Sequence, residues 1–468
     1  MRHRGLELVA PRITPALDPG FRPAVLSCHA FCERARASGH PVTAAVALEQ
    51  ADGSVFRFST ELLPAGHPEA EGNFLHVERW LKFLLWSRGG FRIHFAGPAA
   101  LAAQLQQHYR ESPTGKFDAD IMGRRIYERP FEVVPCAREA LPPARASTQP
   151  LGRHLNGCRI GFDLGGSDRK VAAVMDGNVT FSEEVAWDPI PKSDPQYHFD
   201  GIMRSLKQAA QHLPRVDAIG GSAAGVYVNN RVKVASLFRS VPPPAFEARV
   251  KDLFLEIRRA WNRIPLEVVN DGEVTALAGS MALGQNAVLG IALGTSTAGG
   301  YVTPDGNITS WLNELAFVPV DYSPAAPVDE WSADYGCGAK YLSQQCVGRL
   351  VGPAGIDLEP GLPLPELLKS VQALMARGDL RARRIYETIG AYLGYTIAQC
   401  ADFYAFHHVL ILGRVTSGPG GDIILASARE VLKAEFPELS GRVAFHVPDE
   451  KERRHGQAIA AASLPVID

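Results

Sequence analysis

The chain has 468 residues, too many for one compact domain, and this length predicts two or three domains. An apolar fraction of 46% and a charged fraction of 21% are ordinary for globular proteins, which argues against disorder. The formal net charge of −2 excludes a global electrostatic footprint for nucleic acid, although it leaves room for a small local basic face. We therefore expect no nucleic-acid partner.

Cysteine usage and the lack of long apolar runs predict a cytoplasmic protein. The seven cysteines are scattered and odd in number, which is typical of unpaired thiols in a reducing compartment. The opening sequence, MRHRGLELVAPR, lacks the apolar core of a signal peptide. No stretch of about 18 uninterrupted apolar residues is present, so no membrane span is expected.

Residues 1–136 predict a small α/β module. Its first clear signal is a pair of strand-like runs joined around Asp52 and Gly53, a pattern typical of a hairpin. The predicted elements are, in chain order, a hairpin over 43–60, a helix over 76–86, a strand over 91–95 and a helix over 99–109. The aromatic residues Trp80 and Trp86 favour a helix that faces a core rather than a ligand platform. The pattern indicates no chemistry for this module.

Residues 137–157 predict a linker. The segment is rich in Pro, Ala, Arg and Ser and has no sustained apolar period. It separates the N-terminal module from a longer and more regular part of the chain.

The remainder predicts a duplicated α/β fold with a cleft between its halves. Residues 158–268 are expected to form the first domain and residues 269–454 the second, with a C-terminal helix over 455–468 packing back on the first. The first-domain elements are strands over 159–164, 170–175, 179–185, 216–222 and 265–271 and helices over 199–213 and 244–263. The same cadence repeats with a helix over 272–283, strands over 287–295, 299–303 and 408–413, and a long helix over 381–406.

The first glycine turn follows the first strand of this fold and reads Asp163-Leu-Gly-Gly-Ser-Asp-Arg-Lys. Gly165 and Gly166 let the backbone approach a phosphate, and Ser167 offers a hydroxyl group. We expect Lys170 to belong to the same nucleotide-binding site. Asp163 is placed to hold Mg²⁺ through water. A tight turn with a capping acid explains the same residues equally well.

Two further glycine turns follow buried strands in the second half. Gly294, Thr295 and Ser296 begin a loop in which hydroxyls alternate with glycines, a composition that suits polyphosphate oxygens. Gly413 lies between a strand and a helix, where a nucleotide base or ribose would rest. Taken singly, each loop is also compatible with a plain structural turn.

An Asn-Asp pair ends the last strand of the first half. Asn270 and Asp271 lie at its carboxyl end just before a helix, which is where open α/β sheets hold ligands. Either side chain could simply cap the helix. Capping and a functional role are compatible.

Taken in order, these four elements resemble the ROK family of sugar kinases and repressors, within the actin-like, ribonuclease H-like group of ATPase folds. The resemblance covers roughly residues 158–468, and order and spacing carry it. It implies ATP and Mg²⁺ as cofactors, Asp271 as the catalytic base, and Asp163-Leu-Gly-Gly-Ser and the loop at Gly294 as phosphate loops. Leu412-Gly-Arg-Val resembles the adenosine-side motif, Ala223-Ala-Gly-Val the Pro-Gly-x-Val segment, and His455-Gly-Gln-Ala the closing helix. A homodimer is expected from the resemblance alone.

The sugar side departs from the family pattern. Glu314 is retained and is expected with Asn270 to bind substrate hydroxyls, but Phe317 stands where the family has a histidine. Cys337 is kept, whereas Ala339 replaces an expected glutamate. Only Cys346 is near Cys337 in sequence, and since zinc needs about four N or S ligands, structural zinc is not expected.

The implied reaction is phosphoryl transfer from Mg-ATP to a hydroxyl of a hexose or related carbohydrate. One alternative is a catalytically silent nucleotide- or sugar-binding sensor on the same fold, favoured by the altered sugar segment. A second is a DNA-binding repressor, although residues 1–136 show no clear pair of short helices around a tight turn. The pair Cys28 and Cys32 lacks a second pair for a metal, and residues 451–454 favour a solvated turn.

Overall fold

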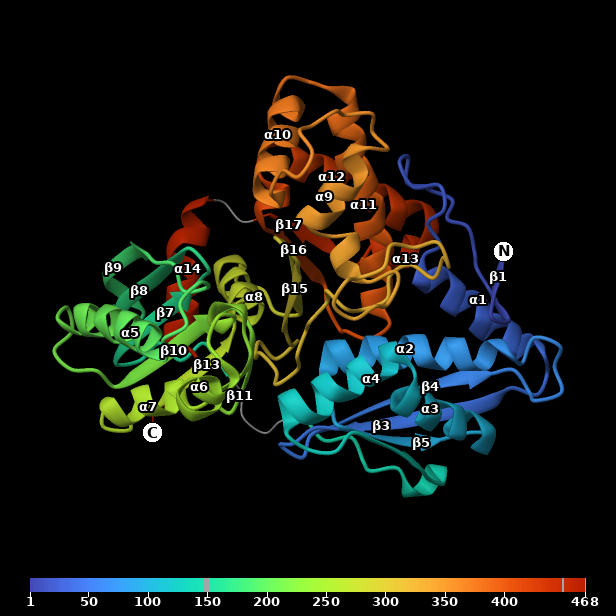
Figure 1. The fold of residues 1–468 in the computed structure, drawn as a ribbon, viewed down its shortest axis with the longest axis horizontal. Coiled ribbons are helices and arrows are strands. Elements are labelled where there is room, and N and C mark those ends of the chain that lie inside the picture. The colour runs from blue at the N-terminus through green and yellow to red at the C-terminus, as the bar shows by residue number, and fades with distance from the viewer. Residues whose placement is uncertain (147–150, 448–449, 468) are drawn as a thin grey trace.

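The computed structural model of the chain describes residues 1–146, 151–447 and 450–467 (Figure 1). Four residues of the predicted linker, 147–150, therefore lie outside the described part. On one side of them Arg145 exchanges backbone hydrogen bonds with Val55, and on the other Leu151 forms a β-bridge with Ile308. Within the described residues, no helix combines the length and apolarity needed to cross a bilayer.

The first half of the core is built on one five-stranded sheet, ordered β13-β10-β7-β8-β9. Strands β7, β8 and β9 form an antiparallel meander, while β10 and β13 run parallel to β7. Helix α14 (Glu450–Ala462) packs against β7 and β10, where a Cβ on Gly161 or Gly220 would collide with its backbone. The elements are β7 (Cys158–Leu164), β8 (Asp168–Met175), β9 (Asn178–Ala186), α5 (Pro195–Ala210), β10 (Ala218–Ala223), β11 (Val226–Val228), β12 (Arg231–Val234), the 3-10 turn Ser236–Phe238, α6 (Pro243–Ala245), the π-helical turn Phe246–Val250, α7 (Leu253–Ala260) and β13 (Leu266–Asn270).

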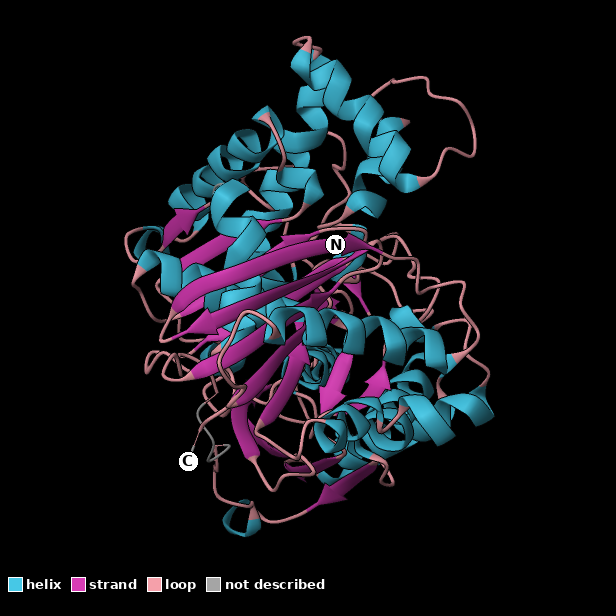
Figure 2. Cartoon of the chain, turned by 90° about the vertical axis from the view of Figure 1, so that its left-hand side faces the viewer, coloured by secondary structure: helices cyan, strands magenta, loops and turns pink. Residues whose placement is uncertain are grey.

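The second half repeats this plan in a four-stranded sheet, ordered β15-β14-β16-β17. A hairpin of β14 and β15 is again followed by parallel strands, here β16 and β17, and helices flank the strands of both sheets (Figure 2). The predicted duplicated actin-like fold is therefore confirmed. The elements are α8 (Asp271–Leu283), β14 (Val288–Leu293), β15 (Thr297–Val302), α9 (Gln344–Val351), α10 (Leu364–Ala376), α11 (Leu380–Ala401), β16 (His408–Leu412), α12 (Pro419–Glu435), α13 (Pro437–Ser440) and β17 (Ala444–His446), with 3-10 turns at Gly338–Lys340 and Arg414–Thr416.

One predicted helix, over 244–263, is wrong as a single element. The chain instead forms α6, a π-helical turn and α7, with a break at Lys251 and Asp252. The carbonyl of Lys251 accepts a hydrogen bond from Val232 of β12, at 3.0 Å, and is therefore withdrawn from the helix. A tertiary hydrogen bond overrides the local helical pattern here.

The N-terminal module contains its own four-stranded sheet, ordered β4-β3-β5-β6, and confirms the expected hairpin, with β3 and β4 paired around residues 50–54. Its elements are β1 (Arg2–His3), β2 (Leu6–Glu7), α1 (Ala24–Ala37), β3 (Val42–Glu49), β4 (Val55–Leu62), α2 (Gly72–Arg88), β5 (Arg92–Ala96), α3 (Ala99–Glu111), α4 (Pro113–Ala119), the π-helical turn Asp120–Tyr127, β6 (Glu132–Pro135) and the 3-10 turn Arg138–Ala140.

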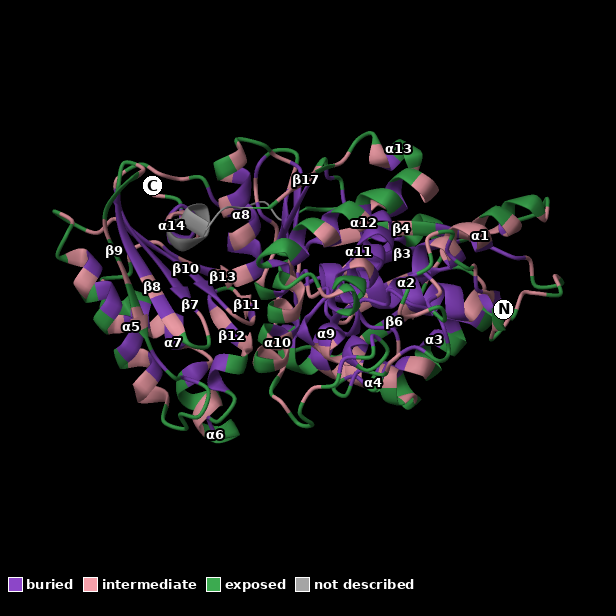
Figure 3. Ribbon diagram, turned by 90° about the horizontal axis from the view of Figure 1, so that it is seen from above, coloured by how far each residue is buried: buried purple, intermediate pink, exposed green. Residues whose placement is uncertain are grey.

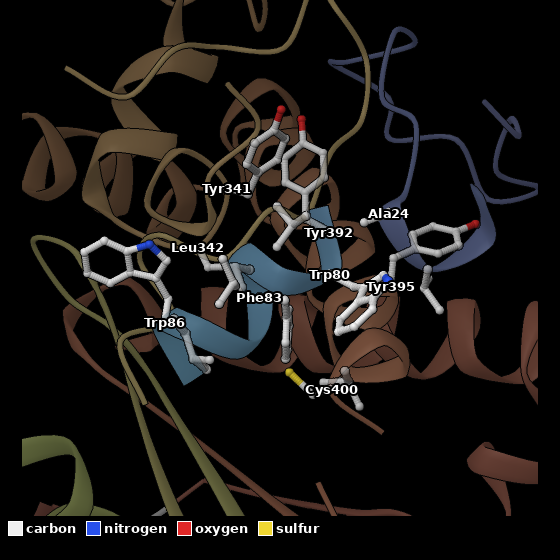
Figure 4. Close-up of a cluster of buried hydrophobic side chains, with 14 of the residues drawn as sticks. Ala24, Trp80, Phe83, Trp86, Tyr341, Leu342, Tyr392, Tyr395 and Cys400 are labelled. Atoms are coloured by element: carbon white, nitrogen blue, oxygen red, sulfur yellow. The ribbon is translucent and has the colours of Figure 1, made fainter. Parts of the chain in front are cut away.

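Helix α2 joins this module to the second half of the core. All its residues except Asn73 and Phe74 are buried, so no face of the helix is left to solvent (Figure 3). Trp80, Phe83 and Trp86 enter the same hydrophobic cluster as Tyr341 and Tyr392 of the second half (Figure 4). The first-half sheet has a separate cluster. The module and the second half therefore share one continuous core, and Trp80 and Trp86 face it as predicted.

A cluster of buried charges lies within this shared core. Lys82 is fully buried, and its Nζ lies 3.0 Å from Asp118 of α4 and 3.0 Å from Asp334 of the second half. Arg79 pairs with the same Asp334 at 3.0 Å and with its neighbour Glu78. The two cations hold the pKa of Asp334 well below its usual range against the opposing effect of burial. The shared core thus holds two cations and three carboxylates in one network.

We expect Lys82→Ala to lower the free energy of unfolding by about 3–5 kcal/mol, because two carboxylates would stay buried without their shared cation. Urea unfolding followed by circular dichroism measures this change. Lys369→Ala is the matched control, since Lys369 pairs with Glu366 on the exposed face of α10 and should cost no more than about 0.5 kcal/mol. Equal losses in the two variants would contradict a role for the cluster.

Candidate active site

Asp163 is the last residue but one of β7 and lies at the carboxyl edge of the first sheet. Its Oδ1 accepts a hydrogen bond from Ser222 of the neighbouring strand β10 at 2.6 Å, and Lys170 Nζ lies 3.7 Å from its Oδ2. Burial raises the pKa of Asp163, although Ser222 and Lys170 both oppose that change. Lys170 also lies 3.5 Å from Asp168, so it balances two carboxylates at this edge.

The turn after Asp163 is closed by few contacts. Gly165 N–H donates to the carbonyl of Asp168 at 2.9 Å, and the indole of Trp187 donates to the carbonyl of Gly165 at 2.8 Å. Gly166 and Ser167 are exposed. A Cβ on Gly166 would meet only a side-chain carbon of Ile190, at 3.6 Å. Packing therefore does not require glycine at this position.

The second loop, after β14, has the same character. Gly294 N–H donates to the carbonyl of Ser296 at 3.0 Å, and its own carbonyl accepts from Gln344 at the start of α9. Thr295 and Ser296 are exposed, and a Cβ on Gly294 would find only the Ser296 carbonyl, at 3.5 Å. Nothing in the packing demands glycine here either.

Gly413, the third predicted loop residue, differs from the other two. It follows β16, which pairs with β14, and it has a φ of +104°. A Cβ at this position would collide with the backbone of Leu293, the residue before Gly294. The fold alone explains this glycine. Because Gly413 has no side chain, the ends of β14 and β16, which carry the second and third loops, can lie close together.

We expect Gly166→Ala to leave the protein as stable or up to about 1 kcal/mol more stable, because alanine restricts the unfolded chain without a clash. Gly413→Ala should destabilise by about 1–3 kcal/mol, because it combines an unfavourable φ with a backbone collision. Urea denaturation of both variants checks the contrast. A destabilised Gly166→Ala protein would show that this glycine serves the fold.

Asn270 and Asp271 lie at the junction of β13 and α8. Asn270 caps the helix, since its Oδ1 accepts from Gly272 N–H at 2.7 Å, and its Nδ2 donates to the carbonyl of Gly225 at 2.8 Å. Asp271 is the first residue of α8 and also accepts from Gly272, at 3.1 Å. The capping interpretation of Asn270 is therefore correct, and its cap fixes the direction of the neighbouring Asp271.

Three carboxyl groups influence one another around Asp271. Burial and the nearby charge of Asp163 raise the pKa of Asp271 to about 6. Burial and the charge of Asp271 in turn raise the pKa of Glu314, from the second half, to about 7. The structure thus brings Asp163, Asp271 and Glu314 together from both halves of the core. The loops at Gly294 and Gly413 lie on the second sheet.

Glu273 is a further acidic residue that the sequence interpretation missed. It is buried one turn into α8, where Oε1 accepts from Asn313 Nδ2 and Oε2 accepts from Tyr301 N–H at 3.2 Å. Burial raises its pKa to about 8. The sequence offered one signal for a buried acid here, because Glu273 directly precedes the mainly apolar run of α8. A buried carboxyl group needs hydrogen-bond partners. Its partner Asn313 directly precedes Glu314, so Glu273 helps to fix the position of that residue.

The N-terminal module holds the same segment from the other side. The carbonyls of Ser87 and Trp86, at the end of α2, accept from the N–H groups of Asn313 and Glu314, each at 3.0 Å. The Trp86 ring also packs on Phe317, with centroids 4.1 Å apart. Phe317 is thus part of an aromatic stack with the module. Sequence spacing gives no signal for these long-range contacts.

The donor set suits one hard cation and offers no cluster for zinc. Asp163 and Asp271 are close enough for one charge to raise the pKa of the other, and Mg²⁺ is commonly bound by one or two carboxylates together with phosphate oxygens. Among the described residues, no group of three or more His, Cys, Asp or Glu side chains could hold a metal. Cys337 is buried near Ser332, Asp334 and Lys82, in the region of the buried charges.

Solved structures share this fold. A ROK hexokinase from Thermus thermophilus aligns with a TM-score of 0.52 and 18% identity, covering 65% of this chain and 96% of that one. A ROK family transcriptional regulator, a homolog of the E. coli MLC protein, aligns with a TM-score of 0.53 and 20% identity, covering 66% and 79%. No protein-family model and no curated protein matches the sequence. The chain therefore has the fold of these ROK structures, as its motifs predicted.

Proposed function

We propose that this protein is an ATP-dependent carbohydrate kinase of the ROK type. The observation that carries the proposal is the position of Asp271, the first residue of α8, near Asp163 and Glu314 and with a pKa raised to about 6. A carboxylate with such a pKa is ionised at neutral pH yet basic enough to accept a proton from a hydroxyl. The glycine turns at Gly166 and Gly294, which packing does not require, support a polyphosphate ligand.

In this proposal Asp271 takes the proton of the acceptor hydroxyl. The acceptor oxygen then bonds to the γ-phosphorus of ATP, and the bond from that phosphorus to the bridging oxygen breaks, so that ADP leaves with the electron pair. Glu314 and Asn270 hold neighbouring hydroxyls of the acceptor. Asp163 would hold Mg²⁺ through water, and the ion would supply neutralisation of phosphate charge.

The nucleotide side is assigned to the exposed loops. The N–H groups around Gly165, Gly166 and Gly294 would face the phosphate oxygens, together with the hydroxyls of Ser167, Thr295 and Ser296. Lys170 already balances Asp163 and Asp168 and would add positive charge beside the phosphates.

All seven cysteines lie in the described residues and are unpaired, which suits a cytoplasmic setting.

We expect Asp271→Asn to reduce turnover at least about a hundredfold while ATP binding stays nearly intact, because an amide cannot accept the proton. The measurement is sugar-stimulated ADP release across hexoses, amino sugars and sugar acids, with ATP binding followed by calorimetry. Asp200→Asn, on the exposed face of α5, is the matched control and should behave like the wild type. Retained turnover in Asp271→Asn would exclude Asp271 as the base.

The pH profile provides a second test. Because the pKa of Asp271 is raised to about 6, the group becomes protonated as pH falls through 6, and kcat/KM should decrease about tenfold for each further pH unit. Glu314, with a pKa raised to about 7, titrates nearby, so the profile is also recorded for Glu314→Gln. That variant should keep the acidic limb near pH 6. A flat profile from pH 7.5 to 5 would contradict the assignment.

A catalytically silent sensor is the second candidate, and one observation favours it. Phe317 stands at the position of a family histidine and is packed between Trp86 and Trp331, so this position offers no hydrogen bond to a sugar. One solved structure with this fold is a regulator. In the ADP-release assay, ATP binding without transfer to any acceptor would support the sensor and contradict the kinase.

A further inference from the structure

A cavity of about 510 Å³ lies where the N-terminal module meets both halves of the core. The module contributes Gln50 and Asp52, the first half contributes Glu267 and Asn270, and the second half contributes Ser310 and Trp311. Its volume is within the range of small-molecule sites in proteins. Asn270 belongs to both this cavity and the candidate active site, so the two are adjacent.

The cavity walls are held together by contacts between the three parts. Ser310 Oγ donates toward Gln50 Oε1 at 3.2 Å and lies 3.3 Å from Asp52 Oδ2. Glu128 of the module pairs with Lys233 of β12 at 3.1 Å and also with Lys251. The module therefore contacts the first half through ion pairs, in addition to sharing a core with the second half.

The chemistry of the lining favours a neutral ligand with many hydroxyl groups. Amide and hydroxyl side chains dominate the polar surface, with Gln50, Asn270 and Ser310 as examples. The lining has three carboxyl groups, Asp52, Glu267 and Glu273, and burial raises the pKa of Glu273 to about 8. The other two are offset by two exposed arginines, Arg145 and Arg258. A strongly charged ligand of either sign would meet groups of its own sign, whereas hydroxyls can donate to the carboxylates and accept from the arginines.

We propose that this cavity binds a neutral carbohydrate unit beyond the sugar that receives the phosphate. The unit is either a second ring joined to the acceptor or a separate sugar molecule, since both present the same chemistry. The N-terminal module then takes part in selecting the ligand, because it supplies one wall of the site. This inference rests on the proposed function for the identity of the neighbouring acceptor site.

The test is calorimetric titration of the full chain with glucose, maltose and cellobiose. Ser310→Trp fills the cavity from an exposed position, Ser310→Ala removes the same hydrogen bonds without filling it, and Ser240→Trp adds a tryptophan at an exposed site outside it. We expect at least tenfold weaker binding of one of these sugars to Ser310→Trp than to the other two variants. Thermal unfolding confirms that all three are folded.

The titration distinguishes a second ring joined to the acceptor from a separate sugar molecule. It also tests the cavity independently of the proposed kinase activity. Tighter 1:1 binding of a disaccharide than of glucose indicates a joined second ring, whereas two bound glucose molecules indicate a separate sugar. Binding is measured without turnover, so a failure of phosphoryl transfer would reject the kinase and leave the cavity result standing. If Ser310→Trp binds all three sugars like Ser310→Ala and Ser240→Trp, the inference is overturned.

Discussion

The arrangement of this protein depends on one buried cation, Lys82, held between Asp118 and Asp334. Removing a charge from water is costly, and the cost is recovered only where partners are fixed at short range. Lys82 meets that condition because α2, α4 and the loop at Asp334 come together around it. Once α2 is fixed, its last carbonyls are in place to hold Asn313 and Glu314. The link from the module to the active site therefore runs through the backbone of one helix.

The candidate active site is built around three carboxyl groups whose pKa values are all raised. Asp163 belongs to the first half of the core, Glu314 belongs to the second, and Asp271 lies at the junction of β13 and α8. Burial disfavours the charge on each of the three. Holding three such groups close together is unfavourable, because burial and their mutual repulsion both disfavour the ionised forms. The buried Glu273 adds a fourth acid, whose hydrogen bonds to Asn313 and Tyr301 connect α8 to the substrate-side segment.

Local patterns predicted the fold of the core and the elements that carry its site. The Asp163 turn, the Asn270-Asp271 pair and the loop at Gly294 could be located because each follows a buried strand within a few residues. Contacts between distant residues could not be predicted: Arg79 and Asp334 are 255 positions apart, and Trp86 meets Phe317 through packing alone. The helix expected over 244–263 failed for the same reason, since a strand hydrogen bond interrupts it at Lys251.

The shared core also constrains the order in which the chain can fold. Helix α2 is synthesised before the second half, but it is buried around almost its whole circumference, and the residues that cover it include Tyr341 and Tyr392 far downstream. Contacts this distant in sequence form slowly, and apolar surface that waits for them favours aggregation or chaperone binding. Helix α2 can therefore complete its packing only after the second half has been synthesised.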